Sequence, residues 1–284
     1  MIDSGRSFGA ANAGRFLGLN RNTSVLLGVI VLVAAGEETW VRFVPKYLEA
    51  LGASVLAIGG YDALKTFLGA AYAWPGGVAV DRFGHRAALT GFTVLSIAGY
   101  VLLFAVQHWA AVLAGAFLFL AWSTLSLPAT FTVVAESLPA GKHAMGIGVQ
   151  SLVRRIPVII GAVAGGVLID RFGIFDGMRY GLAVSILLAA TAILLQQRIA
   201  LPLRAAASAG IGLRAALRRS DPRLVRLLWS DILIRVCERI PFAWIVIYVM
   251  NDLGMSAAAV GVLIAVEMVA AIACYVPAPW LADR

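Results

Sequence analysis

Apolar residues occur in long runs along nearly the whole chain, and polar residues gather in short segments between them. Each run approaches the roughly 20 residues that an α-helix needs to cross the apolar core of a bilayer. The pattern predicts eight membrane spans, at about 24–47, 53–80, 86–107, 110–135, 145–169, 177–195, 227–250 and 256–281. Most connections are very short, so consecutive helices should be antiparallel neighbours. The expected fold class is an all-α polytopic membrane protein.

Composition agrees with a membrane protein and excludes a soluble enzyme. The 284 residues are 61% hydrophobic and only 13% charged, whereas a soluble domain is about one-quarter charged. No nucleotide-binding loop, metal-ligand spacing or nucleophile–base motif occurs outside the apolar runs. We therefore predict no enzyme activity, no cofactor and no metal. Cys237 and Cys274 lie in apolar runs, where we expect buried free thiols.

Lysine and arginine are distributed unevenly over the connecting segments. If the N-terminus is cytoplasmic, most of these residues lie inside, and only Lys46, Arg171 and Arg179 lie outside. Because cytoplasmic segments carry the excess of positive charge, we predict a multi-pass protein of the plasma (inner) membrane with a cytoplasmic N-terminus. The net charge of +8 then reflects topology, and no nucleic-acid partner is expected.

One connection is long and basic, which suggests a division of the chain into three parts. We predict an N-terminal six-helix half at 1–196, a basic cytoplasmic linker at 197–226, and the start of a second half at 227–284. The linker is either a solvated segment or a short helix on the anionic membrane surface, because its leucines alternate with arginines.

Two internal repeats indicate how the spans are organised. The segment at 76–84, GGVAVDRFG, returns at 165–173 as GGVLIDRFG, at the ends of two spans that run in opposite directions. A second repeat has an offset of 202 residues: Leu51-Gly52-Ala53-Ser54 matches Leu253-Gly254-Met255-Ser256, in spans that run the same way. A parallel repeat laid over inverted three-helix units is typical of one class of secondary transporters.

The stretch Gly77-x-x-x-Asp81-Arg82-x-Gly84-His85-Arg86 resembles the signature loop between the second and third helices of the major facilitator superfamily. Segments 135–146 and 161–166 are similar to further motifs of that family, although Ala162 stands where the antiporter motif has proline. The resemblance implies a twelve-span carrier of small molecules. This chain would then be truncated after the eighth helix, with a six-helix N-terminal half and the first two helices of the C-terminal half.

The resemblance also implies a gating role for the signature loop. Asp81 would cap the N-terminus of a helix of the other half, in the manner of a carboxylate at a helix dipole. Its repeat copy, Asp283, would meet the start of span five near Gly146. We expect Asp283 to be held in this way and Asp81 less so.

Charged residues also fall inside the predicted spans, where each costs at least about 2.5 kcal/mol unless it is paired or hydrated. They are Glu37, Glu38, Asp62, Asp231, Glu238, Glu267, Arg42, Lys65, Arg154, Arg155, Arg235 and Arg239. Helical spacing pairs Glu38 with Arg42, Asp62 with Lys65, and Arg235 with Asp231 and Glu238. From the family arrangement, Glu37 would face Arg239 across the cavity, and Glu267 would reach Arg154 or Arg155.

These patterns lead to three sets of candidate functional residues. The substrate and proton cavity would contain Glu37, Glu38, Arg42, Asp62, Lys65, Glu238 and Arg239; the ion pair between halves would contain Arg154, Arg155 and Glu267; and the gating loop would contain Gly77, Asp81, Arg82, Gly84, Arg86, Asp283 and Arg284. The same charges could also be purely structural ion pairs.

The predicted function is secondary active transport of a small molecule by alternating access, coupled to protons. A carboxylate such as Glu37 or Asp62, enclosed as the cavity closes, would exchange its proton for substrate. The expected partners are the substrate, protons and the lipid bilayer. The alternative is a truncated, transport-inactive membrane protein that binds the missing C-terminal helices or a complementary chain.

Overall fold

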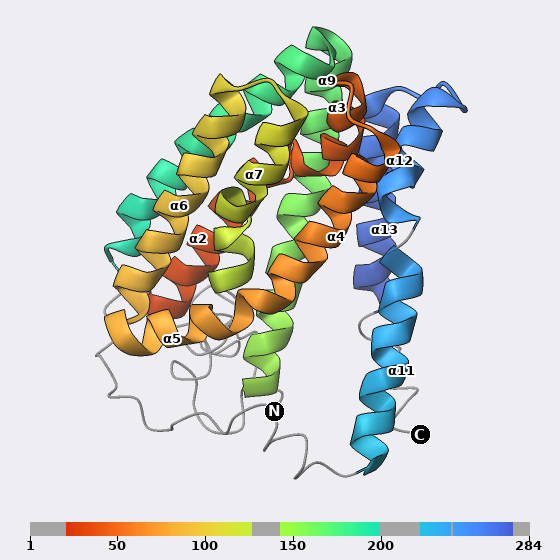
Figure 1. The fold of residues 1–284 in the computed structure, drawn as a ribbon. Coiled ribbons are helices and arrows are strands. Elements are labelled where there is room, and N and C mark those ends of the chain that lie inside the picture. The colour runs from red at the N-terminus through yellow and green to blue at the C-terminus, as the bar shows by residue number, and fades with distance from the viewer. Residues whose placement is uncertain (1–20, 127–142, 199–221, 240, 275–284) are drawn as a thin grey trace, which may run out of the picture.

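The computed structural model describes residues 21–126, 143–198, 222–239 and 241–274. In these residues the chain forms helices joined by short turns (Figure 1). The helices are α2 (Arg21–Glu37), the 3₁₀ helix η1 (Val41–Phe43), α3 (Val44–Ala50), α4 (Val55–Ala71), α5 (Ala73–Phe83), α6 (His85–Ala105), α7 (Trp109–Phe119), α9 (His143–Gln196), α11 (Pro222–Arg239), α12 (Phe242–Asn251) and α13 (Ala257–Cys274).

Three of the predicted spans are each divided into shorter helices. Span one consists of α2, η1 and α3; span two consists of α4 and α5; and span seven consists of α11 and α12. Conversely, α9 contains both span five and span six. Its backbone leaves helical geometry at Gly173 (φ 79°, ψ 170°), and the chain turns back there (Figure 1). Gly177, just past the turn, lies against the backbone of Ile169.

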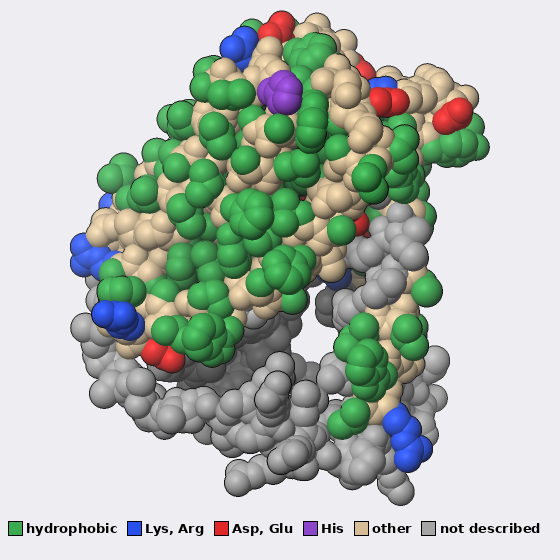
Figure 2. Space-filling view, viewed as in Figure 1, with side chains coloured by type: hydrophobic (Ala, Val, Ile, Leu, Met, Phe, Trp, Pro, Cys, Tyr) green, Lys and Arg blue, Asp and Glu red, His purple; other side chains and the backbone are tan. Residues whose placement is uncertain are grey.

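The helices have the length and apolarity of a membrane protein. Within the described residues, the stretches Ser24–Ala50, His85–Ala105, Trp109–Ser126 and Arg154–Gln196 are long and apolar enough to cross a membrane. Figure 2 shows apolar side chains over the flank of the bundle, with charged groups gathered toward its two ends. The prediction of an all-α membrane fold is confirmed.

Both sequence repeats have matching backbone structure. Gly84 and Gly173 end the two copies of the nine-residue repeat, and each has a φ of 79°. In the longer repeat, Gly52 and Gly254 likewise have positive φ. Glycine adopts this left-handed region without the steric penalty of other residues. After these turns, the hydroxyls of Ser54 and Ser256 each accept a bond of 3.2 Å from the backbone N–H three residues later, which caps the next helix.

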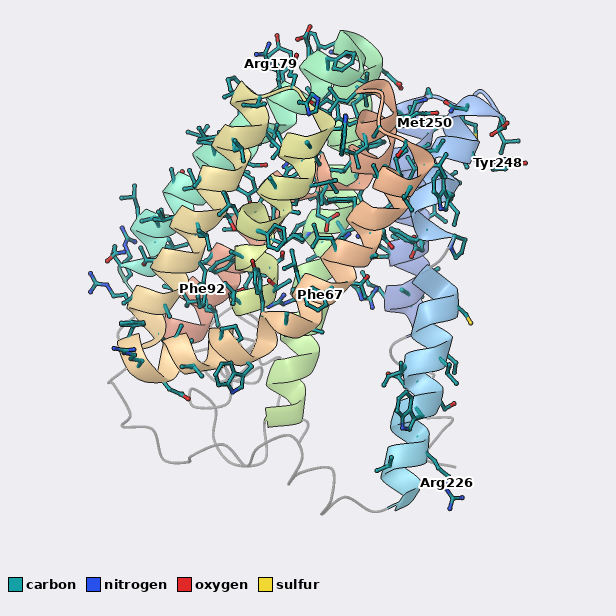
Figure 3. All side chains as sticks on the ribbon, viewed as in Figure 1. Phe67, Phe92, Arg179, Arg226, Tyr248 and Met250 are labelled. Carbon is teal, nitrogen blue, oxygen red and sulfur yellow. The ribbon has the colours of Figure 1, made fainter. Side chains whose placement is uncertain are left out.

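The two ends of the bundle differ. At the closed end, which contains Arg179 (Figure 3), the outer part of span seven, α12, packs against α3 and α4. At the opposite end, which contains Arg226 and is named the open end, α11 stands apart from α4 and α5 among the described residues (Figure 1). Large apolar side chains of α11, such as Leu227 and Trp229, are exposed there.

Cys237 is also exposed on α11, so the expectation of a buried thiol at that position is wrong. The reason is that an apolar segment predicts burial in protein or in lipid without distinguishing them, and α11 has few neighbours among the described helices. Cys274 has a side chain outside the described part of the structure.

Glycines in α9 allow other spans to approach its backbone closely. A methyl group at Gly161 or Gly165 would overlap the backbone of Glu38 or Thr39, and one at Gly166 would overlap the carbonyl of Ala257 in α13. In membranes, small residues at helix contacts let two backbones approach closely. Close packing matters there because lipid is as apolar as the helix surface and the hydrophobic effect contributes little to association. The part of α9 before the turn at Gly173, which we call its first arm, therefore joins span one to span eight.

The substitution Gly165→Ala should destabilise the protein by about 1–3 kcal/mol, because the added methyl group meets the Thr39 carbonyl and no side-chain rotation relieves that overlap. Thermal unfolding in detergent, followed by a thiol-reactive or intrinsic fluorescence signal, should show a lower Tm. Gly91→Ala is the matched control, since Gly91 is on the exposed face of α6 with open space around its Cα. An equal Tm for the two variants would refute the packing argument.

Candidate functional site

The interruption of span one is the structural origin of the candidate site. Helix α2 ends at Glu37, and the Thr39 hydroxyl then donates a 2.6 Å hydrogen bond to the carbonyl of Gly36. A backbone that leaves the helix at membrane depth is tolerated where protein covers it or water reaches it. Here the glycines of α9 lie against the interruption, and Thr39 itself is buried. Two adjacent acids, Glu37 and Glu38, are thereby held in the middle of the bundle.

Glu37 binds a tyrosine from a different span. The hydroxyl of Tyr100, on α6, donates to Glu37 Oε1 at 2.6 Å, a length typical of a hydroxyl bound to a carboxylate. Tyr100 is fully buried, and its ring meets Trp40 edge-on at 5.8 Å between centroids. Trp40 in turn donates to Ser185 Oγ at 2.9 Å. The carboxyl of Glu37 is therefore positioned by residues from three spans.

Other polar groups surround Glu37. Lys65 on α4 and Arg154 on α9 act on its carboxyl electrostatically, as does the neighbouring acid Glu38. Tyr61 is 2% exposed, and its hydroxyl has no hydrogen-bond partner among the described residues. A buried hydroxyl without a protein partner is costly unless it binds water or another molecule. The cluster thus offers a proton acceptor, cationic neighbours and a free hydroxyl donor.

The second acid, Glu38, forms the ion pair that helical spacing predicts. Its Oε2 accepts from Arg42 Nε at 2.7 Å, with both side chains largely buried. The guanidinium of Arg42 also lies 5.7 Å from the ring centre of Phe242 at the start of α12, within the range of a cation–π contact. Span one therefore contacts span seven directly through Arg42.

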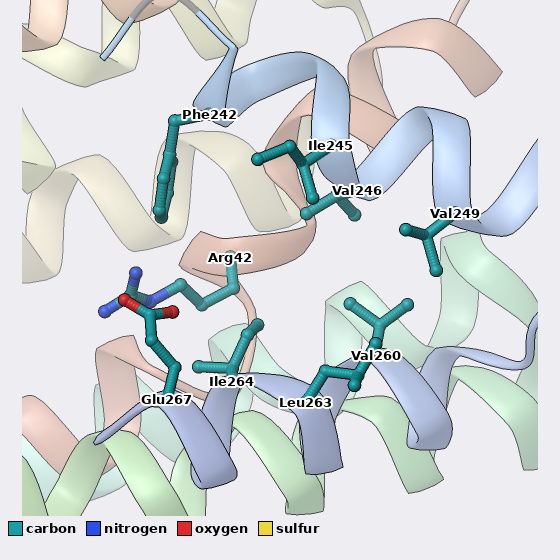
Figure 4. Close-up of a pocket in the computed structure, with 9 residues that line it drawn as sticks. All are labelled: Arg42, Phe242, Ile245, Val246, Val249, Val260, Leu263, Ile264 and Glu267. Carbon is teal, nitrogen blue, oxygen red and sulfur yellow. The ribbon is translucent and has the colours of Figure 1, made fainter. Parts of the chain in front are cut away.

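Arg42 also lines a cavity between spans one, seven and eight. The cavity has a volume of about 130 Å³ and is lined by Arg42, Phe242, Ile245, Val246, Val249, Val260, Leu263, Ile264 and Glu267. Figure 4 shows Arg42 and Glu267 at one end, pointing toward one another, with branched aliphatic side chains along the remainder. An apolar lining with a few charged groups is typical of small-molecule sites, which usually have volumes of roughly 300–1,000 Å³, so this cavity has the lining of such a site in a smaller volume.

Three polar residues connect the two halves at the closed end. Lys46 on α3 donates to Glu49 Oε2 at 2.7 Å and to the side-chain oxygen of Asn251 on α12. Asn251 Nδ2 completes the triangle by donating to Glu49 Oε1 at 2.7 Å. Glu49 and Asn251 are 202 residues apart, the same offset as the longer repeat. Equivalent positions of the two halves thus meet at this end.

Asp170 makes a further connection at the same end. Its Oδ1 accepts from the backbone N–H of Ala257 at 2.8 Å, and its Oδ2 accepts from that of Ala258 at 2.9 Å. These are the first two residues of α13. The carboxylate of the second nine-residue copy therefore caps the N-terminus of span eight, where backbone N–H groups lack partners within the helix.

The predicted gating residues of the first copy lie at the open end. Asp81, Arg82 and Arg86 are exposed there. Arg82 lies over the ring of Phe83 at 5.4 Å, and Arg86 donates to Gln197 Oε1 at 2.7 Å. Asp283 and Arg284 lie outside the described residues, as does the predicted contact of Asp283.

The remaining predicted residues are placed as follows. Asp62 and Lys65 are half-buried on α4, and Arg155 Nη1 lies 3.6 Å from Met268 Sδ on α13. Arg154 lies near Glu37, whereas Glu267 lines the cavity with Arg42. Asp231 is exposed on α11. The side chains of Arg235, Glu238 and Arg239 are outside the described part, and so is the predicted pairing of Arg239 with Glu37.

Sequence reasoning missed Tyr100, Asn251 and Asp170 as site residues. Tyr100 carries no charge and occurs within an apolar run, so no spacing rule selects it. Asp170 was visible as part of the repeat, and the match between 81 and 170 was the signal for a second capping carboxylate. In the part of the chain that the structure describes, no group of three or more His, Cys, Asp or Glu side chains could hold a metal ion.

The substitution Tyr100→Phe should lower the free energy of unfolding by about 1–3 kcal/mol, because a partly buried carboxyl loses its hydroxyl donor. Thermal unfolding of the purified protein measures this. Tyr180→Phe, on the exposed surface of α9, is the control and should leave the Tm unchanged. The loss should also shrink in a Glu37→Leu background, which removes the acceptor, and a full loss there would show that Tyr100 acts independently of Glu37.

Comparison with known proteins agrees with the helices and the repeats. No protein among curated sequences is similar enough to count as a match. The family model of the Major Facilitator Superfamily, in contrast, matches residues 25–284, which is nearly the whole chain. The members of this family are membrane transporters and not enzymes. The chain belongs to the Major Facilitator Superfamily.

Proposed function

We propose that this chain acts in secondary active transport of a small molecule by alternating access, coupled to proton movement through Glu37. The observation that carries the proposal is the bond between the Glu37 carboxyl and the buried Tyr100 hydroxyl, 2.6 Å long, at the point where span one is interrupted. A membrane carboxyl held by a hydroxyl among cationic neighbours is the arrangement of a proton site.

The surroundings of Glu37 are mixed in character. The buried Tyr100, whose ring meets Trp40, donates to its carboxyl, and Lys65 and Arg154 are its cationic neighbours. A movement that carries the cationic side chains away from Glu37, or admits water to it, therefore changes its proton affinity. Transport requires this coupling between conformation and protonation.

The two ends of the bundle support an assignment of the conformation. The closed end has contacts between α3, α12 and α13, while α11 stands apart at the open end. Lys and Arg are more frequent in the sequence segments on the open side, which favours a cytoplasmic position for that end. We assign the structure to an inward-open state in the plasma membrane, with the N-terminus inside.

The substrate would bind in the cavity between spans one, seven and eight. Its charged end contains Arg42, which is bonded to Glu38 next to the proton site. Protonation of Glu37 removes a negative charge adjacent to that ion pair, so substrate and proton occupancy are linked through two successive residues of span one.

The substitution Glu37→Gln should abolish proton coupling and leave insertion and exchange intact, because glutamine can still accept the Tyr100 hydroxyl and cannot ionise. The purified chain is reconstituted in liposomes that contain the pH dye pyranine, and a library of metabolites is screened for compounds that change the internal pH. The compound that causes the largest change in internal pH is then used in labelled form to measure its exchange across the liposome membrane. We expect loss of the pH response with at least half of the exchange rate retained.

The matched control is Asp176→Asn, a charge removal at an exposed residue of α9, which should keep the full pH response. An unchanged pH response in Glu37→Gln would contradict the assignment of Glu37. If no compound moves protons or exchanges in the wild type, the alternative from the sequence is favoured, namely a transport-inactive chain that requires complementary helices.

A further inference from the structure

Asp170 forms hydrogen bonds at the closed end that would have to break during transport. It belongs to α9 in the N-terminal half, and its two bonds go to backbone N–H groups of α13 in the second half. Both carboxylate oxygens are used, at 2.8 and 2.9 Å. The first turn of α13 has no acid of its own, so Asp170 supplies the negative charge that favours a helix N-terminus.

Close packing of the two backbones is a condition for these bonds. An aspartate side chain is short, and its oxygens reach α13 because Gly166 lies against Ala257 and Gly261 lies against Ala162. Hydrogen bonds of this kind are lost when donor and acceptor separate by more than about 0.5 Å beyond their usual length. The contact therefore exists only while the two helices are together at the closed end.

The other copy of the repeat provides an internal comparison. Asp81 and Asp170 occupy the same position in segments identical at seven of nine residues, and both segments end in a glycine with φ of 79°. Asp170 is bonded to a helix N-terminus, whereas Asp81 is exposed at the open end. In this conformation the copy at the closed end is engaged and the copy at the open end is exposed to solvent.

We infer that Asp170 is a latch that holds the closed end shut, and that opening of this end requires its two bonds to α13 to break. The inference rests on the proposed function only in that it assumes alternating access. The partner of Asp170 is the N-terminus of span eight. Asp170 stabilises the state in which the closed end is shut, whereas the family resemblance assigns to Asp81 the state in which the opposite end is shut. The inverted repeat thus places one aspartate latch at each end of the carrier.

The test measures the separation of the closed end directly. Spin labels are placed at Ala50, next to Glu49, and at Leu253, next to the α12–α13 turn, in a background with Cys237→Ser and Cys274→Ala. Electron–electron distances are then recorded in lipid nanodiscs without substrate. Asp170→Asn should increase the ratio of separated to closed molecules about tenfold, because the amide loses the charge and one of the two acceptor oxygens. A distance distribution identical to that of the unsubstituted protein would overturn the latch.

A second variant protects the test against misfolding of Asp170→Asn. Ala258→Pro removes the N–H that Asp170 Oδ2 accepts, at a half-buried position in the first helical turn, where proline breaks no bond within the helix. It should shift the distances in the same direction, and an unchanged distribution in this variant would also contradict the latch.

Asp81→Asn is the matched control in the other copy of the repeat. It should not increase the separated population at the closed end, and an increase equal to that of Asp170→Asn would show a non-specific effect of charge removal. All variants are measured at one fixed pH, so the comparison of Asp170→Asn with the unsubstituted protein does not require Glu37 to be the proton site. A shift in Asp170→Asn together with normal proton coupling in Glu37→Gln would therefore support the latch and reject the proton site.

Discussion

The close approach of the first arm of α9 to its neighbours is the constraint on which the rest of the structure depends. In a bilayer, apolar helices gain little by leaving lipid for one another, so their association relies on tight packing and on bonds between helices. Gly161 and Gly165 bring the interrupted backbone of span one against α9, and Gly166 brings α13 against the same helix. One helix arm thus holds both halves, with glycines at its closest backbone contacts.

This packing explains how acids can lie in the middle of an apolar bundle. The backbone interruption after Glu37 would be costly in lipid, but α9 covers it and the Thr39 hydroxyl satisfies a freed carbonyl. Glu38 is neutralised within its own span by Arg42. Glu37 instead relies on Tyr100 from another span. Of these two acids, Glu37 is therefore the one whose position depends on tertiary contacts.

The repeated nine-residue segment shows how one local structure serves two ends of a carrier. Each copy places an aspartate three residues before a glycine that reverses the chain, so each presents a carboxylate at the end of a span. Whether the carboxylate finds a helix N-terminus depends on how the halves are tilted. In the present conformation Asp170 is engaged together with the Lys46, Glu49 and Asn251 triangle, and at the opposite end the described α11 stands apart from α4 and α5. Closure at one end and separation at the other are two aspects of a single arrangement.

The sequence by itself determined the elements and their periodicity: the apolar runs predicted the spans, the repeats predicted the paired turns at Gly84 and Gly173, and helical spacing predicted the Glu38–Arg42 pair. These depend on contacts within a span or on hydropathy, which are local. Only the tertiary structure decided that Glu37 meets Tyr100, that Arg42 shares a cavity with Glu267, and that Asp170 caps α13. Those contacts join residues 63 to 225 positions apart, and no local pattern specifies the rotation of one helix against another, because that rotation is set by glycine-to-backbone packing in three dimensions.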